Sequence, residues 1–247
     1  YDATNLERFG LMIRNSENAA YNYHKQMVGS GSAWSTSDGQ QMLWDAERTP
    51  VTMIAYAPYM SEAAPDASLA VNALTNQATE ENVKSSDFLL MKATVDPEQD
   101  LTADGKLKIS LSHAMSKLII KITVNGTADA AMNKLGDMSI NGAVVNGICD
   151  MSATVPMVVP APDAVVATVA PYKGTESCEC ILPPQKIAEG FSVNFSYDGK
   201  LYIWTAKEAI ELEKGVEHTL TLNVNTTVRL AGKMARNWAT GQLIDRN

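Results

Sequence analysis

KLKISLSHAMSKLIIKITV, residues 106–124, contains two alternating runs that indicate an all-β fold. From Lys106 to Ser112 apolar residues alternate with Lys and Ser, which is the pattern of a strand with one buried face. The alternation resumes at Leu118 and runs to Val124, now with the apolar residues at even positions. Because one straight strand cannot move its apolar side chains from odd to even positions, we predict a bulge or bend within His113–Ser116.

Strand patterns also lie on either side of this stretch. Phe191–Tyr197 alternates, Asp198-Gly199 follows, and Leu201–Trp204 is again rich in residues that favour strands. Asp-Gly between two such runs predicts a hairpin with a tight turn, because both central positions need positive φ. Val216–Val224 is another alternating run. The first part of the chain has four candidates: Phe9–Ile13, Gln41–Trp44, Val51–Tyr56 and Asp87–Met91.

The segments between these strands suggest how the chain is divided. Asp96–Gly105 is polar and contains Pro and Gly, so we predict a domain boundary there, with residues 1–104 and 105–247 as two domains. Many short strands separated by turn residues predict an all-β fold of two tandem β-sandwich domains. Two further segments are interpreted as loops: Ser61–Ser86, with a short helix around Leu69–Leu74, and Pro156–Pro171.

Charge and composition exclude several classes of partner. The net charge of −8 disfavours a nucleic-acid-binding protein, whose affinity depends on Lys and Arg that neutralise phosphates. It also disfavours an anionic membrane surface. No apolar run of about 18 residues occurs that would span a bilayer. Tyr1–Asn5 lacks the basic residues of a secretory leader, which fits either a cytoplasmic protein or an exported one whose leader has been removed.

The sequence contains no catalytic or metal-binding motif, so we expect no catalytic residue, cofactor or metal site. The acidic residues between Asp96 and Asp104 lack the spacing of a calcium loop and are interpreted as a solvated linker. Paired carboxylates of a hydrolase leave no sequence signature, because that pairing is spatial. The histidines and cysteines are expected to be structural side chains with hydrogen-bond partners or buried thiols: His24, His113, His218, Cys149, Cys178 and Cys180.

Three aromatic residues leave one alternative open. Tyr21, Tyr23 and Trp34 lie in a stretch rich in Ser, Gly and Asn, which is typical of a surface loop. If they were exposed and coplanar they would form a platform for a sugar ring. Otherwise they cover the core or a neighbouring domain.

From about Phe9 to Gly241 the chain resembles the fimbrillin-like proteins of Bacteroidota, which build the type V pilus. No one segment is specific, but the order and spacing of several are typical of that family. The segments are Arg8–Ile13 with Trp34 and Trp44 downstream, Val51–Tyr59, Ser112–Leu118, and Ile181–Gln185 followed by the hairpin and Leu212–His218.

The resemblance implies two transthyretin-like β-sandwich domains, export as a lipoprotein and anchorage at the outer membrane. It also implies assembly by strand donation, in which a protease removes the first strand after a basic residue and a strand of the next subunit fills the vacated groove. We expect the chain to begin near that processing point. For the donated strand the sequence suggests Thr226–Ile244, with Val228, Leu230 and Met234 as apolar anchors.

The function expected from this resemblance is that of a non-enzymatic structural subunit of a fimbria at the cell surface. Its expected partners are other fimbrial subunits, joined by strand addition, with a host or bacterial surface glycan or protein as a target of adhesion. Any membrane attachment would be through a lipid. An outer-surface glycan-binding β-sandwich module is the alternative, and stalk, anchor and tip roles all stay open.

Overall fold

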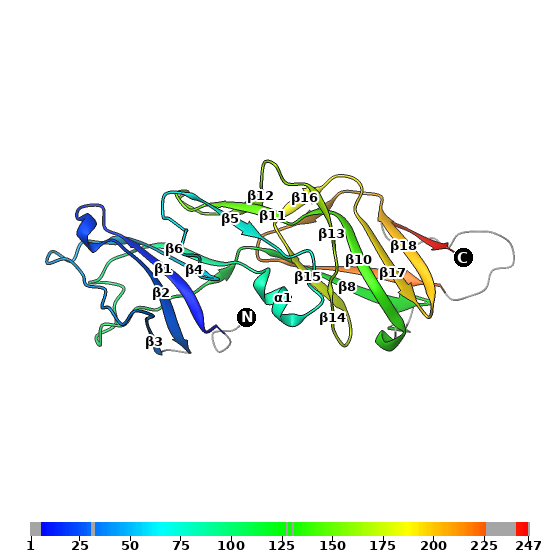
Figure 1. The fold of residues 1–247 in the computed structure, drawn as a ribbon, viewed down its shortest axis with the longest axis horizontal. Coiled ribbons are helices and arrows are strands. Elements are labelled where there is room, and N and C mark those ends of the chain that lie inside the picture. The colour runs from blue at the N-terminus through cyan, green and yellow to red at the C-terminus, as the bar shows by residue number, and fades with distance from the viewer. Residues whose placement is uncertain (1–5, 31–32, 127, 130, 226–240, 247) are drawn as a thin grey trace. The chain divides into compact units, whose positions relative to one another are not determined.

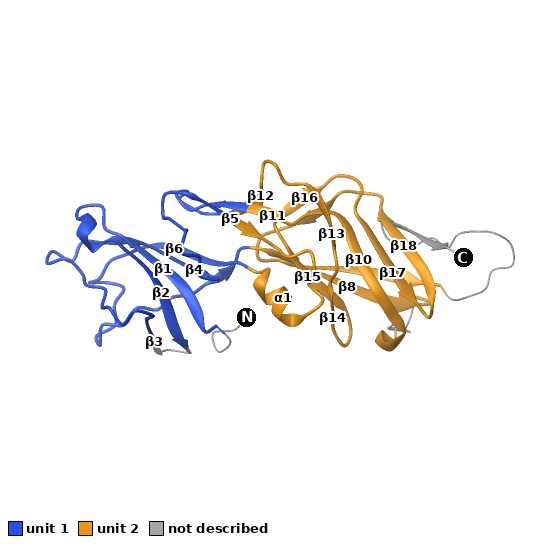
Figure 2. Cartoon of the chain, viewed as in Figure 1, with its two compact units in different colours: residues 1–70, 88–114, 148–157 blue, residues 71–87, 115–147, 158–247 orange. Residues whose placement is uncertain are grey.

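The computed structural model describes residues 6–30, 33–126, 128–129, 131–225 and 241–246. The chain is almost entirely β, as predicted, and forms two compact units (Figures 1 and 2). Unit 1 contains residues 1–70, 88–114 and 148–157, and unit 2 contains residues 71–87, 115–147 and 158–247. The units therefore alternate along the chain, and the predicted boundary at residue 104 lies inside one segment of unit 1. A division into autonomously folding halves at that point stays a prediction.

Unit 1 is built on a six-stranded antiparallel sheet with the order β3-β2-β1-β4-β6-β7. β1 and β4 lie in the middle and are buried along almost their whole length, which is why their buried positions form nearly continuous apolar runs rather than an alternating pattern. A short 3-10 helix, η1 (Ala19–Tyr21), joins the first two strands. The strands are β1 (Arg8–Arg14), β2 (Tyr23–Ser30), β3 (Ala33–Thr36), β4 (Val51–Ala57), β6 (Leu89–Val95) and β7 (Ser112–His113).

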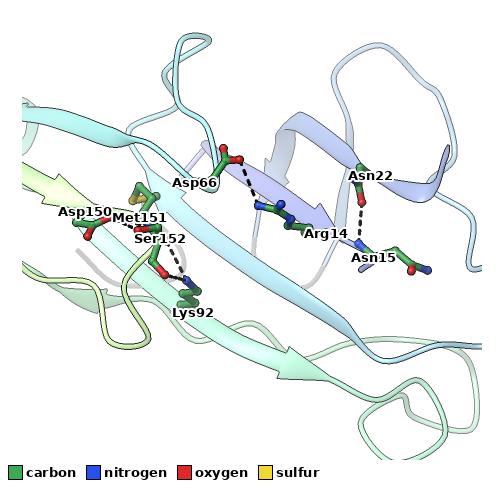
Figure 3. A network of polar contacts seen from close by, with 8 residues as sticks. All are labelled: Arg14, Asn15, Asn22, Asp66, Lys92, Asp150, Met151 and Ser152. Atoms are coloured by element: carbon green, nitrogen blue, oxygen red, sulfur yellow. Dashed lines mark hydrogen bonds and ion pairs between the residues drawn. The ribbon is translucent and has the colours of Figure 1, made fainter. Parts of the chain in front are cut away.

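Polar contacts hold other parts of unit 1 against one face of this sheet (Figure 3). Lys92 of β6 donates from Nζ to the carbonyl oxygens of Met151, Ser152 and Ala153, at 2.9, 3.1 and 2.9 Å. Arg14 of β1 forms an ion pair with Asp66 at 3.3 Å. Met12, Ile54 and Tyr56 on this face are almost completely buried. This side of the sheet is thus closed by the chain itself.

A three-stranded sheet contains three of the five places where the chain passes from one unit to the other. Its order is β12-β11-β5, and the passages fall after Ala70 in β5, after Gly147 in β11 and directly before β12. Its strands are β5 (Ser68–Asn72), β11 (Asn146–Asp150) and β12 (Val158–Pro160).

Unit 2 has two larger sheets, with the orders β13-β10-β17-β18-β21 and β14-β15-β8-β20. β9 pairs with β8, β16 pairs with β19, and β20 runs parallel to β8. Alternate residues of the central strands are buried, which is the pattern of a β-sandwich. The elements are α1 (Glu80–Ser85), β8 (Ser116–Val124), β9 (Ala128–Asp129), η2 (Met132–Lys134), β10 (Leu135–Val144), β13 (Val166–Val169), β14 (Tyr172–Lys173), β15 (Cys178–Leu182), β16 (Gln185–Ile187), β17 (Ser192–Tyr197), β18 (Lys200–Ala206), β19 (Ile210–Leu212), β20 (Glu217–Val224) and β21 (Gly241–Arg246).

Two local predictions are confirmed. β17 and β18 form the expected hairpin, and Asp198 and Gly199 have φ of 51° and 78°, as a primed turn requires. The change of phase around His113–Ser116 is also present. There the chain leaves β7, which pairs with β6, and enters β8, which pairs with β15 and β20. The shift from odd to even positions therefore marks a change of sheet.

Other predictions were wrong. Residues 69–74 contain β5 rather than a helix, because Leu69 and Val71 are buried on one side of a strand. The helix is instead α1, which begins after Thr79, where the Thr79 hydroxyl accepts from the Asn82 N–H at 3.2 Å. The loop predicted for residues 156–171 contains the short strands β12 and β13. Neither Gln41–Trp44 nor residues 107–111 form strands, because neither segment has a partner strand beside it.

Candidate functional site

The second face of the unit 1 sheet is covered differently from the first. Its apolar side chains all point to one side of the sheet, and where a second sheet would be expected two irregular segments lie on them, residues 40–45 and 105–111. The partly buried side chains of these segments are Met42, Trp44, Leu107, Ile109 and Leu111. The buried cluster beneath them consists of Phe9, Leu11, Ile13, Met27, Val51, Met53, Ala55, Ala57, Leu89 and Val95.

Segment 40–45 is held mainly by side chains. The hydroxyl of Tyr23 accepts from the N–H of Leu43 at 3.1 Å and donates to its carbonyl oxygen at 3.2 Å. Thr36 Oγ1 donates to the carbonyl oxygen of Gln40 at 2.6 Å, and Lys25 Nζ donates to the Gln40 side chain at 2.9 Å. Met42 and Trp44 are half-buried while Gln41 and Leu43 are exposed, so the segment has the alternation of an extended chain.

Segment 105–111 shows the same alternation. Leu107, Ile109 and Leu111 are half-buried, and the Lys and Ser residues between them are exposed. Its only strand-like contact within the described residues is an isolated bridge between Leu101 and Leu107. The sequence pattern thus correctly predicted which side chains of this segment are half-buried. The segment nevertheless lacks the neighbouring strand that would make it part of a sheet.

A pocket of about 220 Å³ opens between these two segments and the sheet. β1 and β4 form its floor through Leu11, Ile13, Val51 and Met53. Leu43 at its edge is 61% exposed, so the pocket communicates with solvent. The remaining lining residues are Asn15, Tyr21, Met42, Trp44, Asp45, Leu101, Gly105, Leu107 and Ile109.

The Asn15 and Asp45 side chains of the pocket already have hydrogen-bond partners. Asn15 Nδ2 donates to Asp45 Oδ2 at 2.7 Å, and the Thr49 N–H donates to Asp45 Oδ1 at 2.8 Å. Hydrogen bonds from Thr49 hold the pKa of the Asp45 carboxyl below its ordinary value. Asp45 is therefore a charged structural anchor, which leaves the pocket suited to an apolar side chain.

Unpaired backbone groups border the pocket. The N–H and the C=O of Leu43 both point toward Tyr23. Because these groups alternate in direction from one residue to the next along an extended chain, the N–H and C=O groups of Met42 and Trp44 point to the opposite side. Within the described residues these groups have no hydrogen-bond partner, and residues 108–111 pair with no strand. An apolar floor flanked by unpaired backbone is the arrangement that accepts an added β-strand.

The three aromatic residues considered for a sugar platform serve unit 1 itself. Trp34 packs edge-on against Phe9, with ring centroids 4.8 Å apart. Tyr23 packs on the same cluster and holds Leu43, and Tyr21 lines the pocket. No observation therefore favours a glycan platform built from these residues.

The histidines and cysteines occupy structural positions. His24 Nε2 lies 2.8 Å from the hydroxyl of Tyr56, which donates to the Met60 carbonyl oxygen at 2.8 Å. His218 Nε2 accepts from the Glu213 N–H at 2.9 Å, and His113 lies in β7. The cysteines Cys149, Cys178 and Cys180 are buried free thiols, as predicted, and burial raises the pKa of Cys178 to about 11.

The residues between Asp96 and Asp104 hydrogen bond among themselves, for example from the Asp96 N–H to Asp100 Oδ2 at 2.8 Å. In the part of the chain that the structure describes, no three acidic, His or Cys side chains converge as metal ligands would. No helix there is long and apolar enough to cross a membrane.

The pocket was missed by sequence reasoning, although both of its borders were predicted as strands. The sequence marked Gln41–Trp44 and residues 107–111 as strand-like runs, but it did not indicate whether a strand lies beside either of them. The suggested donor anchors Val228, Leu230 and Met234 lie outside the described residues. The last described segment, β21, pairs with β18.

Comparison with known proteins gives a consistent result. A family model described as fimbrillin-like matches residues 3–238. The structure of a candidate cell adhesion protein from Bacteroides uniformis is similar over all of this chain and 91% of its own, with a TM-score of 0.69 and 16% identity. A counterpart from Bacteroides ovatus covers all of this chain and 87% of its own, with a TM-score of 0.67 and 16% identity.

A fimbrial protein from Bacteroides ovatus is similar over 96% of this chain, which spans 48% of that protein, with a TM-score of 0.56 and 14% identity. At these identities the structures establish the fold alone. No protein of curated function matches the chain.

Proposed function

The chain belongs to the fimbrillin-like family, and from that premise we propose that it is a structural subunit of a bacterial surface fimbria that polymerises by β-strand donation. The observation that supports this most directly is the open apolar pocket of unit 1, bordered by segments 40–45 and 105–111, where the backbone groups of Met42, Trp44 and residues 108–111 pair with no strand in the described part of the chain. A strand laid between them would pair with free backbone groups and bury alternate side chains on β1 and β4.

The donated strand comes from residues 226–240 of a second copy, because β21, which follows them, pairs with β18 of its own chain. Its even positions from Val228 to Met234 are Val, Leu, Gly and Met, whereas its odd positions are Arg, Ala and Lys. That is the alternation of a strand with one face to bury. Donation from one copy into the next is a head-to-tail contact, which continues into a filament if it does not close into a ring.

Charge supports the same pairing. Residues 226–247 contain four basic residues and one acidic residue, a charge of +3, so the rest of the chain carries −11 to give the total of −8. Opposite charges on donor and acceptor accelerate association and make it sensitive to salt.

Location and attachment are part of the proposal. A fimbrial subunit acts at the cell surface, and we propose export as a lipoprotein, with proteolytic removal of a preceding strand as the event that frees the groove. Two transthyretin-like domains, adhesion to a surface glycan or protein, and a non-enzymatic role belong to the same proposal.

A cross-linking experiment tests strand donation. One copy carries Ile109→Cys in segment 105–111, and a second copy carries one cysteine at a time, as Val228→Cys, Leu230→Cys, Met234→Cys or Trp238→Cys, because only the donor position beside the pocket comes within disulfide distance of residue 109. After mixing and mild oxidation we expect a disulfide-linked dimer of the two. The control replaces Lys134, an exposed residue of unit 2, with Cys in the acceptor copy. Cross-linking of the Ile109 variant no stronger than that of the control would contradict donation into this groove.

A further inference from the structure

The pocket of unit 1 has the size and lining of a socket for one large aromatic ring. An engineered cavity of about 150 Å³ lined by Leu, Ile and Phe takes up a benzene molecule. The present pocket is about 220 Å³ and is lined mainly by Leu, Ile, Val, Met and the ring of Trp44. In proportion to heavy atoms, the nine-atom ring system of an indole would need roughly 225 Å³, which is about the size of this pocket.

The surroundings of the pocket limit how such a ring can enter. The floor residues Leu11 and Met53 are 3% and 2% exposed, so the pocket is closed beneath by the packed sheet. Leu43 at the edge is 61% exposed, so a side chain can enter from solvent. Beside it lie backbone groups of Met42 and Trp44 that have no hydrogen-bond partner among the described residues. An aromatic side chain on an extended strand would enter from solvent, rest on the packed floor and bring its own backbone beside these groups.

The sequence offers one aromatic residue in the proposed donor. After Asn225 the only aromatic side chain is Trp238, which is at an even position, like Val228, Leu230 and Met234. Side chains at even positions of a strand share one face. We propose that Trp238 of a second copy fills this pocket and is the main anchor of the donated strand. This inference rests on strand donation as the proposed function, and it names the residue that gives the contact its strength.

An aromatic anchor is preferred over the aliphatic residues on physical grounds. Valine or leucine would leave much of the pocket empty, and an unfilled apolar cavity loses contacts on every side. A tryptophan buries a large area with few rotatable bonds, and tryptophans in desolvated pockets are prominent among interface hot spots. Its N–H can stay hydrated because the pocket is open at Leu43.

Peptide binding to the full chain tests this inference. A fluorescein-labelled peptide of residues 226–240 is titrated with the protein and its anisotropy is measured. We expect Trp238→Ala in the peptide to weaken binding about 30-fold or more, as loss of a hot spot does. The matched peptide with Met234→Ala should weaken binding less than tenfold. Trp238→Phe should fall between the unaltered peptide and Trp238→Ala.

A protein variant locates the binding site. Ile109→Trp adds an indole to the border of the pocket from an irregular segment, and we expect it to reduce binding of the unaltered peptide about tenfold or more. Lys134→Trp, on the exposed surface of unit 2, should leave binding unchanged. Circular dichroism of both variants reports whether they are folded.

The outcomes separate the two proposals. If the unaltered and the Trp238→Ala peptides bind equally well, the anchor is wrong while strand donation stands. If binding depends on Trp238 but not on Ile109→Trp, the ring occupies another site and the inference is overturned. If no peptide binds and the cross-linking experiment also fails, strand donation is wrong and the anchor falls with it.

Discussion

Gly10 lies on β1 directly beneath the ring of Tyr56, and a Cβ at this position would overlap the ring atom Cζ. Tyr56 cannot move aside, because it is 0% exposed and its hydroxyl is held by His24 and Met60. We expect Gly10→Ala to reduce the free energy of unfolding by about 2–3 kcal/mol, which is typical of overpacking. Chemical denaturation followed by circular dichroism measures this.

Gly136 provides the control for this prediction. A Cβ there would overlap only the hydroxyl oxygen of Ser196, which can rotate away. Gly136→Ala should therefore change stability by less than about 1 kcal/mol. Equal losses in the two variants would show that contact with Tyr56 is not the cause.

His24 makes the stability of unit 1 depend on pH. Burial lowers the pKa of His24 from its ordinary value of 6.5, partly opposed by Glu62. The unfolded chain therefore binds a proton more readily than the folded chain, so this contribution is complete above about pH 6.5 and is lost as the pH falls below it. We expect the denaturation midpoint to decrease between pH 7 and 5, and His24→Gln to remove that decrease.

Carboxylates act in a separate range of pH. Hydrogen bonds lower the pKa of Asp45 and Asp150 from the ordinary value of 3.8, so their contributions are lost only below about pH 4. A decrease between pH 7 and 5 that persists in His24→Gln would assign the effect to other groups.

At the scale of elements, segment 40–45 depends on one hydroxyl group. Tyr23→Phe removes both hydrogen bonds to Leu43 and leaves the apolar ring in place. We expect amide hydrogen exchange at Leu43 to accelerate at least about fivefold, since the lost bonds contribute roughly 1 kcal/mol or more to local opening. Hydrogen exchange with mass spectrometry or NMR measures the rate.

Tyr21 serves as the matched position, because it lines the same pocket and its hydroxyl has no hydrogen-bond partner in the described part of the chain. Tyr21→Phe should leave exchange at Leu43 unchanged. If Tyr23→Phe also has no effect, the segment is held by its apolar contacts rather than by Tyr23.

At the scale of the whole molecule, the alternation of the two units along the chain predicts that a fragment cut at residue 104 is less stable than the same residues in the full chain. Residues 71–87 belong to unit 2, and within them Gln77 is completely buried. Its side chain accepts from the Ile181 N–H and donates to the Ile181 carbonyl oxygen, both at 2.8 Å. A fragment of residues 105–247 would leave these backbone groups unpaired, at about 1–3 kcal/mol for each.

We therefore expect this fragment to unfold at a lower urea concentration than unit 2 does in the full chain, and a peptide of residues 71–87 to restore part of the loss. Circular dichroism with and without the peptide measures both effects. A fragment as stable as unit 2 in the full chain would instead establish residue 104 as a boundary between autonomous domains.

The sequence by itself determined the all-β class, the hairpin at Asp198-Gly199, the change of phase near His113 and the resemblance to fimbrillin-like proteins. These features depend on local chemistry, because alternation and turn residues act over a few positions. Only the tertiary structure decided that Leu107, Ile109 and Trp44 border a pocket instead of lying in a sheet. Whether a strand has a neighbour depends on residues distant in the chain, and a half-buried run has the same pattern with or without one.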